Sequence, residues 1–320
     1  MSVQAVSIDT DIHLKSILVA TDFSSASEKA LHHALSIARY YDAKLYVMHV
    51  VSSLGLTMNG PDAVAAATTA ALRDAMLAER KLVENGALRD LRHQVIVRSG
   101  DIWNELQAEI KQQGIDLVVL GTHGRTGVKR LVLGSVAEQI FRSACCRVLT
   151  VGPGSPANAH LEPDGTPRSL LFATDFSDAS LKALPHAISL ANQRGSNLVL
   201  LHILSAVPDV EGHRWYTAAD VVEMRRAAES DARKRLQPLI ANIPLAAEPQ
   251  LAVNFGEPAE GILRSASKLD PEVIVLGLKC RSHVESTSHL PWSTAYDVVC
   301  NASCPVLTVR TTPQDWAFLG

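Results

Sequence analysis

The feature that most constrains this chain is an internal repeat. Three segments of the first half recur in the second half in the same order. The pairs are 17–50 with 170–203, 95–121 with 251–277, and 146–151 with 304–309. The first pair aligns without a gap, and about half of its positions are identical. Self-similarity of this kind indicates repeated structural units, so the sequence predicts two copies of one domain.

The repeat sets the expected domain boundaries within the 320 residues. We expect a first domain over 13–151 and a second over 169–310. Residues 152–168 are rich in glycine, proline and small polar residues, a composition typical of a linker. Residues 311–320 have no counterpart in the first half and are interpreted as a C-terminal tail.

Each copy alternates short aliphatic runs with longer segments of helical periodicity. In the first copy, the strands are predicted at 15–21, 43–50, 93–99, 116–121 and 147–151, and the helices at 22–41, 62–91, 102–113 and 136–143. Near-continuous apolar strands separated by helices indicate a parallel sheet covered on both faces. The predicted fold class is therefore α/β, with two tandem Rossmann-like domains, each a five-stranded parallel sheet with helices on both faces.

A glycine-rich stretch, GTHGRTGVKRLVLGSVAEQI at 121–140, follows the fourth predicted strand. Ligands of such sheets bind outside the carboxyl ends of the strands. Gly121 and Gly124 leave backbone N–H groups unobstructed, and successive N–H groups can form a concave anion site. Gly134 and Ser135 begin a helix, whose free N–H groups and dipole favour phosphate. The stretch predicts a phosphate-binding loop.

The stretch resembles the G-x-x-G-x(9)-G-[ST] nucleotide motif of the universal stress protein family, and ILVATDFSSASEKAL at 17–31 resembles that family's first strand and helix. The resemblance covers nearly the whole chain in two tandem copies. It implies a fold related to the adenine-nucleotide α-hydrolases. It also implies a bound adenine nucleotide, ATP first and ADP or AMP as alternatives, together with Mg²⁺ and without rapid turnover.

The resemblance also implies which residues hold the nucleotide. Asp22 would lie near the adenosine and reach the metal indirectly, through the nucleotide-bound Mg²⁺; Val50, or its neighbour Val51, would contact adenine. The full set of expected binding residues is Ala20, Thr21, Asp22, Val50, Leu120, Gly121, Gly124, Gly134, Ser135, Val136 and Ala137. The loop also holds Arg125, Lys129, Arg130 and His123, which either attract anions or are simply solvated. No catalytic residue is assigned.

The second copy departs from the motif. Cys280 stands where the first copy has its second glycine, and Trp292 stands where it has Gly134. Bulky side chains would crowd backbone that must approach phosphate, so we expect this copy to bind ATP weakly or not at all. Asp175 remains, so the adenosine end of the site can persist. Cys280, His283 and His289 are a weak alternative as metal ligands, because their spacing matches no common metal motif.

The net charge and the N-terminal sequence bear on which partners and which location to expect. The net charge of −3 gives no electrostatic reason to expect nucleic acid or an anionic membrane as a partner. The N-terminus lacks the basic start and apolar core of a signal peptide, so a cytoplasmic protein is expected. The two fifth strands are predicted sheet edges, and the two halves could pair with each other there within one chain, which would hide both edges. The family resemblance implies a homodimer, and an unidentified protein partner is left open.

The sequence is compatible with three functions. A nucleotide-dependent regulatory protein of the stress response is favoured. A slow ATPase or an adenylyl-transfer enzyme on the same fold is the alternative, so enzymatic activity is left open at no more than slow ATP hydrolysis. A dehydrogenase ranks last, because neither copy has G-x-G-x-x-G after its first strand.

Overall fold

The computed structural model describes most of the chain, as two compact units. The described residues are 12–52, 61–122, 133–156, 168–205, 217–241, 243, 245, 247–279 and 290–311. We refer to the unit from His13 to Pro156 as the first domain and to that from Arg168 to Thr311 as the second domain.

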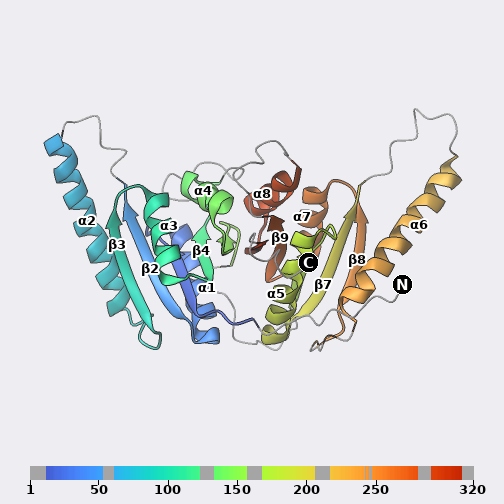
Figure 1. Ribbon diagram of the computed structural model, residues 1–320, viewed down its shortest axis with the longest axis horizontal. Helices are drawn as coiled ribbons and strands as arrows, with labels where there is room; N and C mark the ends of the chain where they lie inside the picture. Colours follow the sequence, from blue (N-terminus) through green and yellow to red (C-terminus); the bar gives the residue numbers. More distant parts are fainter. Residues whose placement is uncertain are drawn as a thin grey trace, which may run out of the picture. The chain divides into compact units, whose positions relative to one another are not determined.

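The first domain alternates strands and helices along its length (Figure 1). The elements are β1 (Ser16–Ala20), α1 (Ser25–Tyr41), β2 (Lys44–Val51), α2 (Pro61–Glu84), β3 (His93–Ser99), α3 (Ile102–Gln113), β4 (Leu117–Gly121), α4 (Ser135–Ser143) and β5 (Arg147–Val151). Its strands are parallel and lie in the order β3-β2-β1-β4-β5.

The second domain repeats this arrangement. The elements are β6 (Ser169–Ala173), α5 (Asp178–Arg194), β7 (Asn197–Leu204), α6 (Ala218–Leu236), η3 (Gln237–Leu239), β8 (Gln250–Phe255), α7 (Pro258–Leu269), β9 (Val273–Lys279), α8 (Leu290–Asn301) and β10 (Val306–Thr311). Its strands are also parallel, in the order β8-β7-β6-β9-β10. The predicted fold class is confirmed for both copies.

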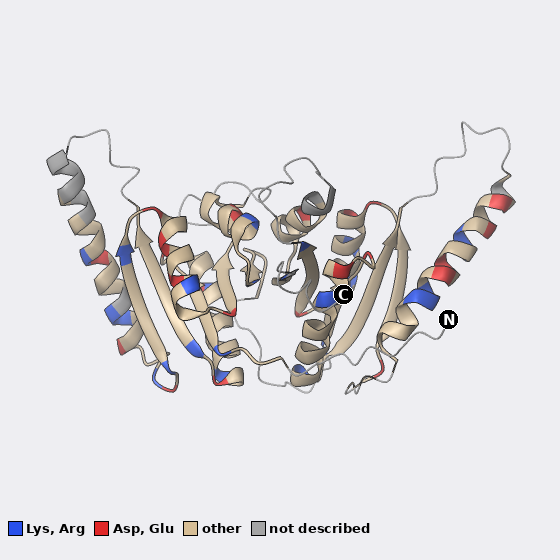
Figure 2. Ribbon diagram, in the orientation of Figure 1, with Lys and Arg blue, Asp and Glu red and all other residues tan. Residues whose placement is uncertain are grey.

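The central strands of each sheet are buried because helices cover both faces. Right-handed crossovers place α1 and α2 on one face of the first sheet and α3 and α4 on the other, and α3 contacts α4. Ile17, Leu18 and Val19 of β1 have no exposed surface. Figure 2 shows the charged residues mainly on the helices and at the strand ends, while the strands themselves are largely uncharged. This is the pattern of a sheet buried on both sides.

The predicted helix limits were mostly correct, and the main error is α2. The helical pattern predicted a helix over 62–91, but α2 ends at Glu84. Gly86 follows with a φ of +75°, a left-handed conformation that ends a helix. At α1, the residue that caps the helix is Ser24, whose side chain accepts a hydrogen bond from the Ser27 amide.

Strand order decides where a ligand can bind. The chain runs outward from β1 in one direction through β2 and β3, and in the other through β4 and β5. The connections therefore diverge at the carboxyl ends of β1 and β4, where such sheets have their crevice. None of the described helices combines the length and apolar character needed to cross a bilayer.

Candidate nucleotide site

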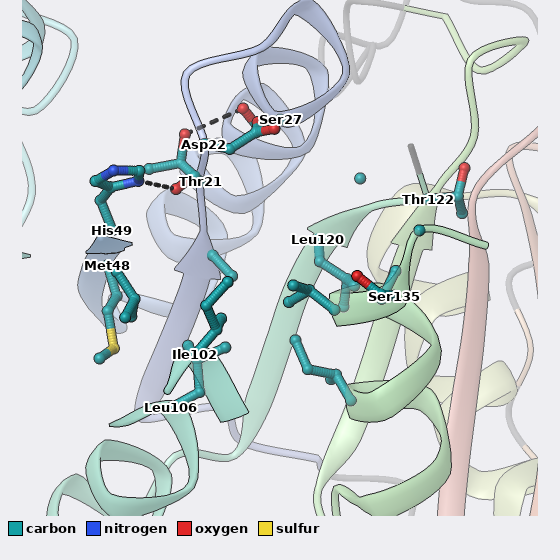
Figure 3. A pocket seen from close by; sticks show the side chains of 17 residues that line it. Thr21, Asp22, Ser27, Met48, His49, Ile102, Leu106, Leu120, Thr122 and Ser135 are labelled. Carbon is teal, nitrogen blue, oxygen red and sulfur yellow. Dashed lines mark hydrogen bonds between the residues drawn. The ribbon is translucent and has the colours of Figure 1, made fainter. Parts of the chain in front are cut away.

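A pocket of about 190 Å³ lies at this crevice of the first domain (Figure 3). It is formed by the ends of three strands, the β1–α1 turn, and the first turns of α3 and α4. The residues that line it are Ala20, Thr21, Asp22, Ser27, Met48, His49, Val50, Ile102, Leu106, Leu120, Gly121, Thr122, Gly134, Ser135, Val136, Ala137 and Ile140.

The β1–α1 turn forms one wall of the pocket. The Asp22 carboxylate accepts a hydrogen bond from the Ser24 amide (Oδ1–N, 3.0 Å), which fixes the direction of its side chain. The Thr21 hydroxyl accepts from the Phe23 amide at 3.0 Å and donates to the Ser27 hydroxyl at 3.1 Å. These short-range side-chain bonds fix the conformation of the turn between β1 and α1. They also hold one carboxylate at the edge of the pocket.

His49 contributes to the same wall as a structural residue. Its Nδ1 lies 2.7 Å from the Thr21 carbonyl oxygen (Figure 3), which requires the proton on that nitrogen. The Phe23 ring packs against the imidazole, with 4.8 Å between the ring centroids. His202, at the matching place in the second domain, makes the same bond to Thr174 at 2.8 Å. The repetition supports a role in fixing the turn.

The floor of the pocket is apolar. Met48 and Val50 are two residues apart on β2 and therefore point to the same face of the sheet. Leu106 of α3, Leu120 of β4 and Ile140 of α4 complete the floor, and each is less than 5% exposed. An apolar surface at the base of a polar rim suits a flat aromatic ring system such as a nucleobase.

The first turn of α4 forms the opposite wall. Gly134 is the N-cap, and no side chain caps this helix. The first intrahelical bond joins the Glu138 amide to the Gly134 carbonyl, so the amides of Ser135, Val136 and Ala137 have no acceptor within the helix. Figure 3 shows Ser135 and Asp22 on opposite sides of the pocket, with Leu120 between them. Bare amides at a helix N-terminus attract an anion.

The two described glycines of the motif serve different purposes. Gly134 has a φ of −58°, which any residue can adopt, so its advantage is the absence of a side chain beside these amides. A Cβ at Gly121 would lie 3.0 Å from the carbonyl carbon and oxygen of Ala26, at the start of α1. Gly121 is therefore needed for close packing of α1 on β4, a role the motif alone did not reveal.

The structure brings nearly all of the expected binding residues together. Ten of the eleven line this single pocket, and the exception, Gly124, lies outside the described residues, as do His123, Arg125, Lys129 and Arg130. Of the two alternatives at the end of β2, Val50 lines the pocket. The placement agrees with the expected site, whereas the binding roles themselves stay predictions.

Sequence reasoning missed most of the apolar floor. Ile102 and Leu106 come from α3, which the motif does not include, although their spacing of four residues places them on one helix face. Thr122 was also missed. Its carbonyl accepts from the Gly134 amide at 2.9 Å, and its own amide donates to Val151 at 3.0 Å. These bonds tie the two ends of the glycine loop to the sheet.

Mg²⁺ fits this site only as a companion of the nucleotide. Mg²⁺ in nucleotide sites is usually held by one or two carboxylates together with phosphate oxygens. Asp22 supplies the one carboxylate among the described lining residues. Elsewhere in the described ranges, no group of three or more His, Cys, Asp or Glu side chains is placed to hold a metal. The alternative ligands Cys280, His283 and His289 fall outside those ranges.

The corresponding edge of the second domain differs at its helix. Ser293 matches Ser135 in the repeat, yet α8 begins three residues earlier, at Leu290. Trp292 therefore lies within the first turn of α8, rather than at a cap before it. Gly277 matches Gly121, and a Cβ there would lie 2.0 Å from the Ala179 carbonyl oxygen, so close helix packing also requires this glycine.

Known proteins agree with this description. The model of the universal stress protein family matches residues 13–152 and 167–310. A universal stress protein of Methanocaldococcus jannaschii is 33% identical over 141 residues, covering 43% of this chain and 81% of its own length. One from Mycolicibacterium smegmatis is 26% identical over 301 residues, covering 92% and 96%.

A solved structure extends the agreement to the fold. The crystal structure of a universal stress protein from Archaeoglobus fulgidus superposes with a TM-score of 0.61 at 18% identity, covering 92% of this chain and 98% of its own. At that identity, the likeness speaks for the fold alone. The family match covers most of the chain, in two successive copies. The chain therefore belongs to the universal stress protein family, as a tandem pair of its domains.

Proposed function

We propose that the first domain binds ATP, with Mg²⁺, and that the bound nucleotide regulates the protein in a stress response. The observation that carries the proposal is the combination found in one pocket: an apolar floor for the base, one carboxylate, and the bare amides at the start of α4 for phosphate. ADP and AMP fit the same base and ribose regions and differ only in how many phosphates the amides receive.

The nucleotide is proposed to act as a ligand and not as a rapidly consumed substrate. The one imidazole among the described lining residues is His49, and its Nδ1 is engaged with the Thr21 carbonyl. A bound nucleotide can regulate only if its affinity differs between two states of the protein. The alternatives are a slow ATPase and an adenylyl-transfer enzyme. Phosphate release above roughly one per minute by the purified protein would favour the ATPase, since typical enzymes turn over far faster.

The first test is to identify the nucleotide that co-purifies with the full chain, by mass spectrometry of the supernatant after denaturation. We expect ATP, and we expect Gly134→Trp to abolish it, because an indole would cover the amides of α4. A milder variant, Ser135→Ala, should weaken ATP binding about tenfold, as expected for a lost hydrogen bond to a charged group.

The matched control is Ser293→Ala, the same change at the corresponding position of the second domain. It should leave ATP affinity unchanged. An unaltered affinity in Ser135→Ala and Gly134→Trp, in protein with a normal circular dichroism spectrum, would refute the site.

The remaining parts of the proposal concern the whole protein. We propose domain limits of 13–151 and 169–310, a cytoplasmic location, and a homodimer that engages a protein partner in a nucleotide-dependent way. Light scattering coupled to size exclusion, with and without ATP, tests the dimer, for which a mass near twice 34.5 kDa is expected.

A further inference from the structure

The segment that follows β5 is held against α1 by two side chains of that helix. The Lys29 ammonium donates to the carbonyl oxygens of Pro153 at 2.7 Å and Ser155 at 3.0 Å. Nε2 of His33 lies 3.3 Å from the Pro156 carbonyl oxygen, which requires the proton on that nitrogen. Lys29 and His33 are four residues apart and therefore lie on one face of α1. We call this pair the clamp of the first domain.

The clamp holds its segment by main-chain atoms. All three contacts are made to carbonyl oxygens. Ser155 is only 1% exposed, but its hydroxyl makes no hydrogen bond within the described residues. The turn that presents the carbonyls is also closed by the main chain, because the Ser155 amide donates to the Gly152 carbonyl at 3.1 Å. Since every residue has a carbonyl, such a clamp can hold a segment of different sequence.

The second domain carries the same pair of side chains on its own first helix. Lys182 matches Lys29 and His186 matches His33 in the repeat, and both lie on α5 with the same spacing of four residues. Lys29 and Lys182 are each partly exposed, so either ammonium group can reach a segment on the surface. α5 contacts β10, as α1 contacts β5. Each clamp therefore lies on the helix that contacts the last strand of its domain.

The chain that leaves this last strand in the second domain is the C-terminal tail. β10 ends at Thr311, and residues 312–320 lie outside the described ranges. β10 runs two residues further than β5 does in the repeat, so the tail has to return by about 7 Å to reach the clamp. Nine extended residues span up to about 30 Å, which is ample. The tail includes Trp316, Phe318 and Leu319, whose burial on a surface is favourable.

We propose that Lys182 and His186 bind the C-terminal tail of the same chain, through main-chain carbonyls just beyond Thr311. The tail is the occupant that fits, because it leaves the strand that α5 contacts, as residues 152–156 leave the strand that α1 contacts. The lysine would supply charge-assisted bonds, which are stronger than neutral ones. No clamp residue lines the nucleotide pocket, so the proposal does not depend on ATP binding.

Chymotrypsin cleavage of the full chain after Trp316 and Phe318, followed by mass spectrometry, tests the docking. Cleavage requires the tail to leave the surface, so its rate reports the undocked fraction. We expect the tail to be cut about tenfold more slowly in the full chain than in a synthetic peptide of residues 305–320. Lys182→Ala should remove most of this protection, since bonds from a charged group contribute about tenfold or more.

Matched variants make the test specific. Lys182→Gln keeps most of the side chain and should speed cleavage as Lys182→Ala does, which separates the charged donor from packing. Lys29→Ala, the same change in the first clamp, should leave tail cleavage unchanged. The proposal is wrong if the tail is cut at equal rates in wild type and both Lys182 variants, all with a normal circular dichroism spectrum. Cleavage that slows as the protein concentration rises would assign the clamp to the tail of a second copy, and would also overturn it.

Discussion

The turns after β1 and β6 are almost identical, whereas the segments that lead into α4 and α8 are not. Thr174 accepts from the Phe176 amide at 2.9 Å and shares a 2.9 Å bond with the Ser180 hydroxyl, as Thr21 does with Phe23 and Ser27. At the other side of the crevice, α4 begins after a bare glycine, and α8 begins three residues earlier in the repeat. One side of the crevice was kept in both copies and the other changed.

The repeated turn contains a costly backbone conformation. Phe23 and Phe176 have φ values of 59° and 61°, in the left-handed region that bulky residues rarely occupy. Each ring packs on a histidine that bonds the strand carbonyl, with 4.8 Å and 4.5 Å between centroids. The surrounding bonds and packing offset a cost of about 1–2 kcal/mol. The turn is thus a structural unit that both domains need, whatever they bind.

The comparison of the two domains shows that residues at the crevice can differ while the sheet stays the same. Both domains keep the strand order, the close contact of the first helix with the fourth strand, and an apolar floor. Among the described residues of this edge, the helix start and the acidic residue before the third helix differ. Ligand preference can therefore diverge through a few positions at the crevice.

The largest expected effect comes from the two packing glycines. Gly277→Ala should destabilise the second domain by about 3 kcal/mol, because the new methyl group would overlap backbone of Ala179. Gly121→Ala should cost the first domain only about 1 kcal/mol, since its nearest contacts are at 3.0 Å. The slowest-exchanging amides of each domain measure its free energy of unfolding. Equal losses in the two variants would show that the domains pack alike here.

An effect smaller than that of Gly277→Ala, and equal in the two domains, is expected at the caps of α1 and α5. Ser24→Ala and Ser177→Ala each remove a side-chain cap that accepts a 3.3 Å bond from the amide three residues later. Each change should cost its own domain about 1 kcal/mol. Urea denaturation of each variant, in nucleotide-free protein, measures the loss in free energy of unfolding. A difference of more than about 1 kcal/mol between the two would contradict the equivalence of the turns.

The smallest effect is a pH dependence at Asp175. Burial raises its pKa, but hydrogen bonds from Ser177 and Ser180 outweigh burial and lower the pKa in the folded protein, so its ionised form stabilises the second domain above the unfolded pKa of about 3.9. That contribution is lost as the pH falls through the lower, folded pKa. Asp175→Asn should therefore lower the urea midpoint more at pH 7 than at pH 3. If the substitution lowers the urea midpoint by the same amount at both pH values, this assignment is wrong. Asp22→Asn is the corresponding variant in the first domain.

Local patterns accounted for much of the secondary structure. The helix at 102–113 and the strand at 147–151 begin and end where the patterns predicted. Apolar periodicity and caps are properties of neighbouring residues, so a sequence reveals them directly. The end of α2 was missed because apolar residues recur at Leu88 and Leu91, beyond Glu84, while the backbone turns at Gly86.

The sequence by itself determined the repeat, the α/β alternation, and the edge of the sheet where the pocket lies, because each of these depends on neighbouring residues or on an order along the chain. Only the tertiary structure decided that Gly121 makes room for Ala26, that Leu106 of α3 completes the floor, and that Glu257 faces a pocket while Asp101 caps a helix. These facts depend on how elements distant in the sequence pack together, and packing is a property of three-dimensional contacts that no local pattern contains.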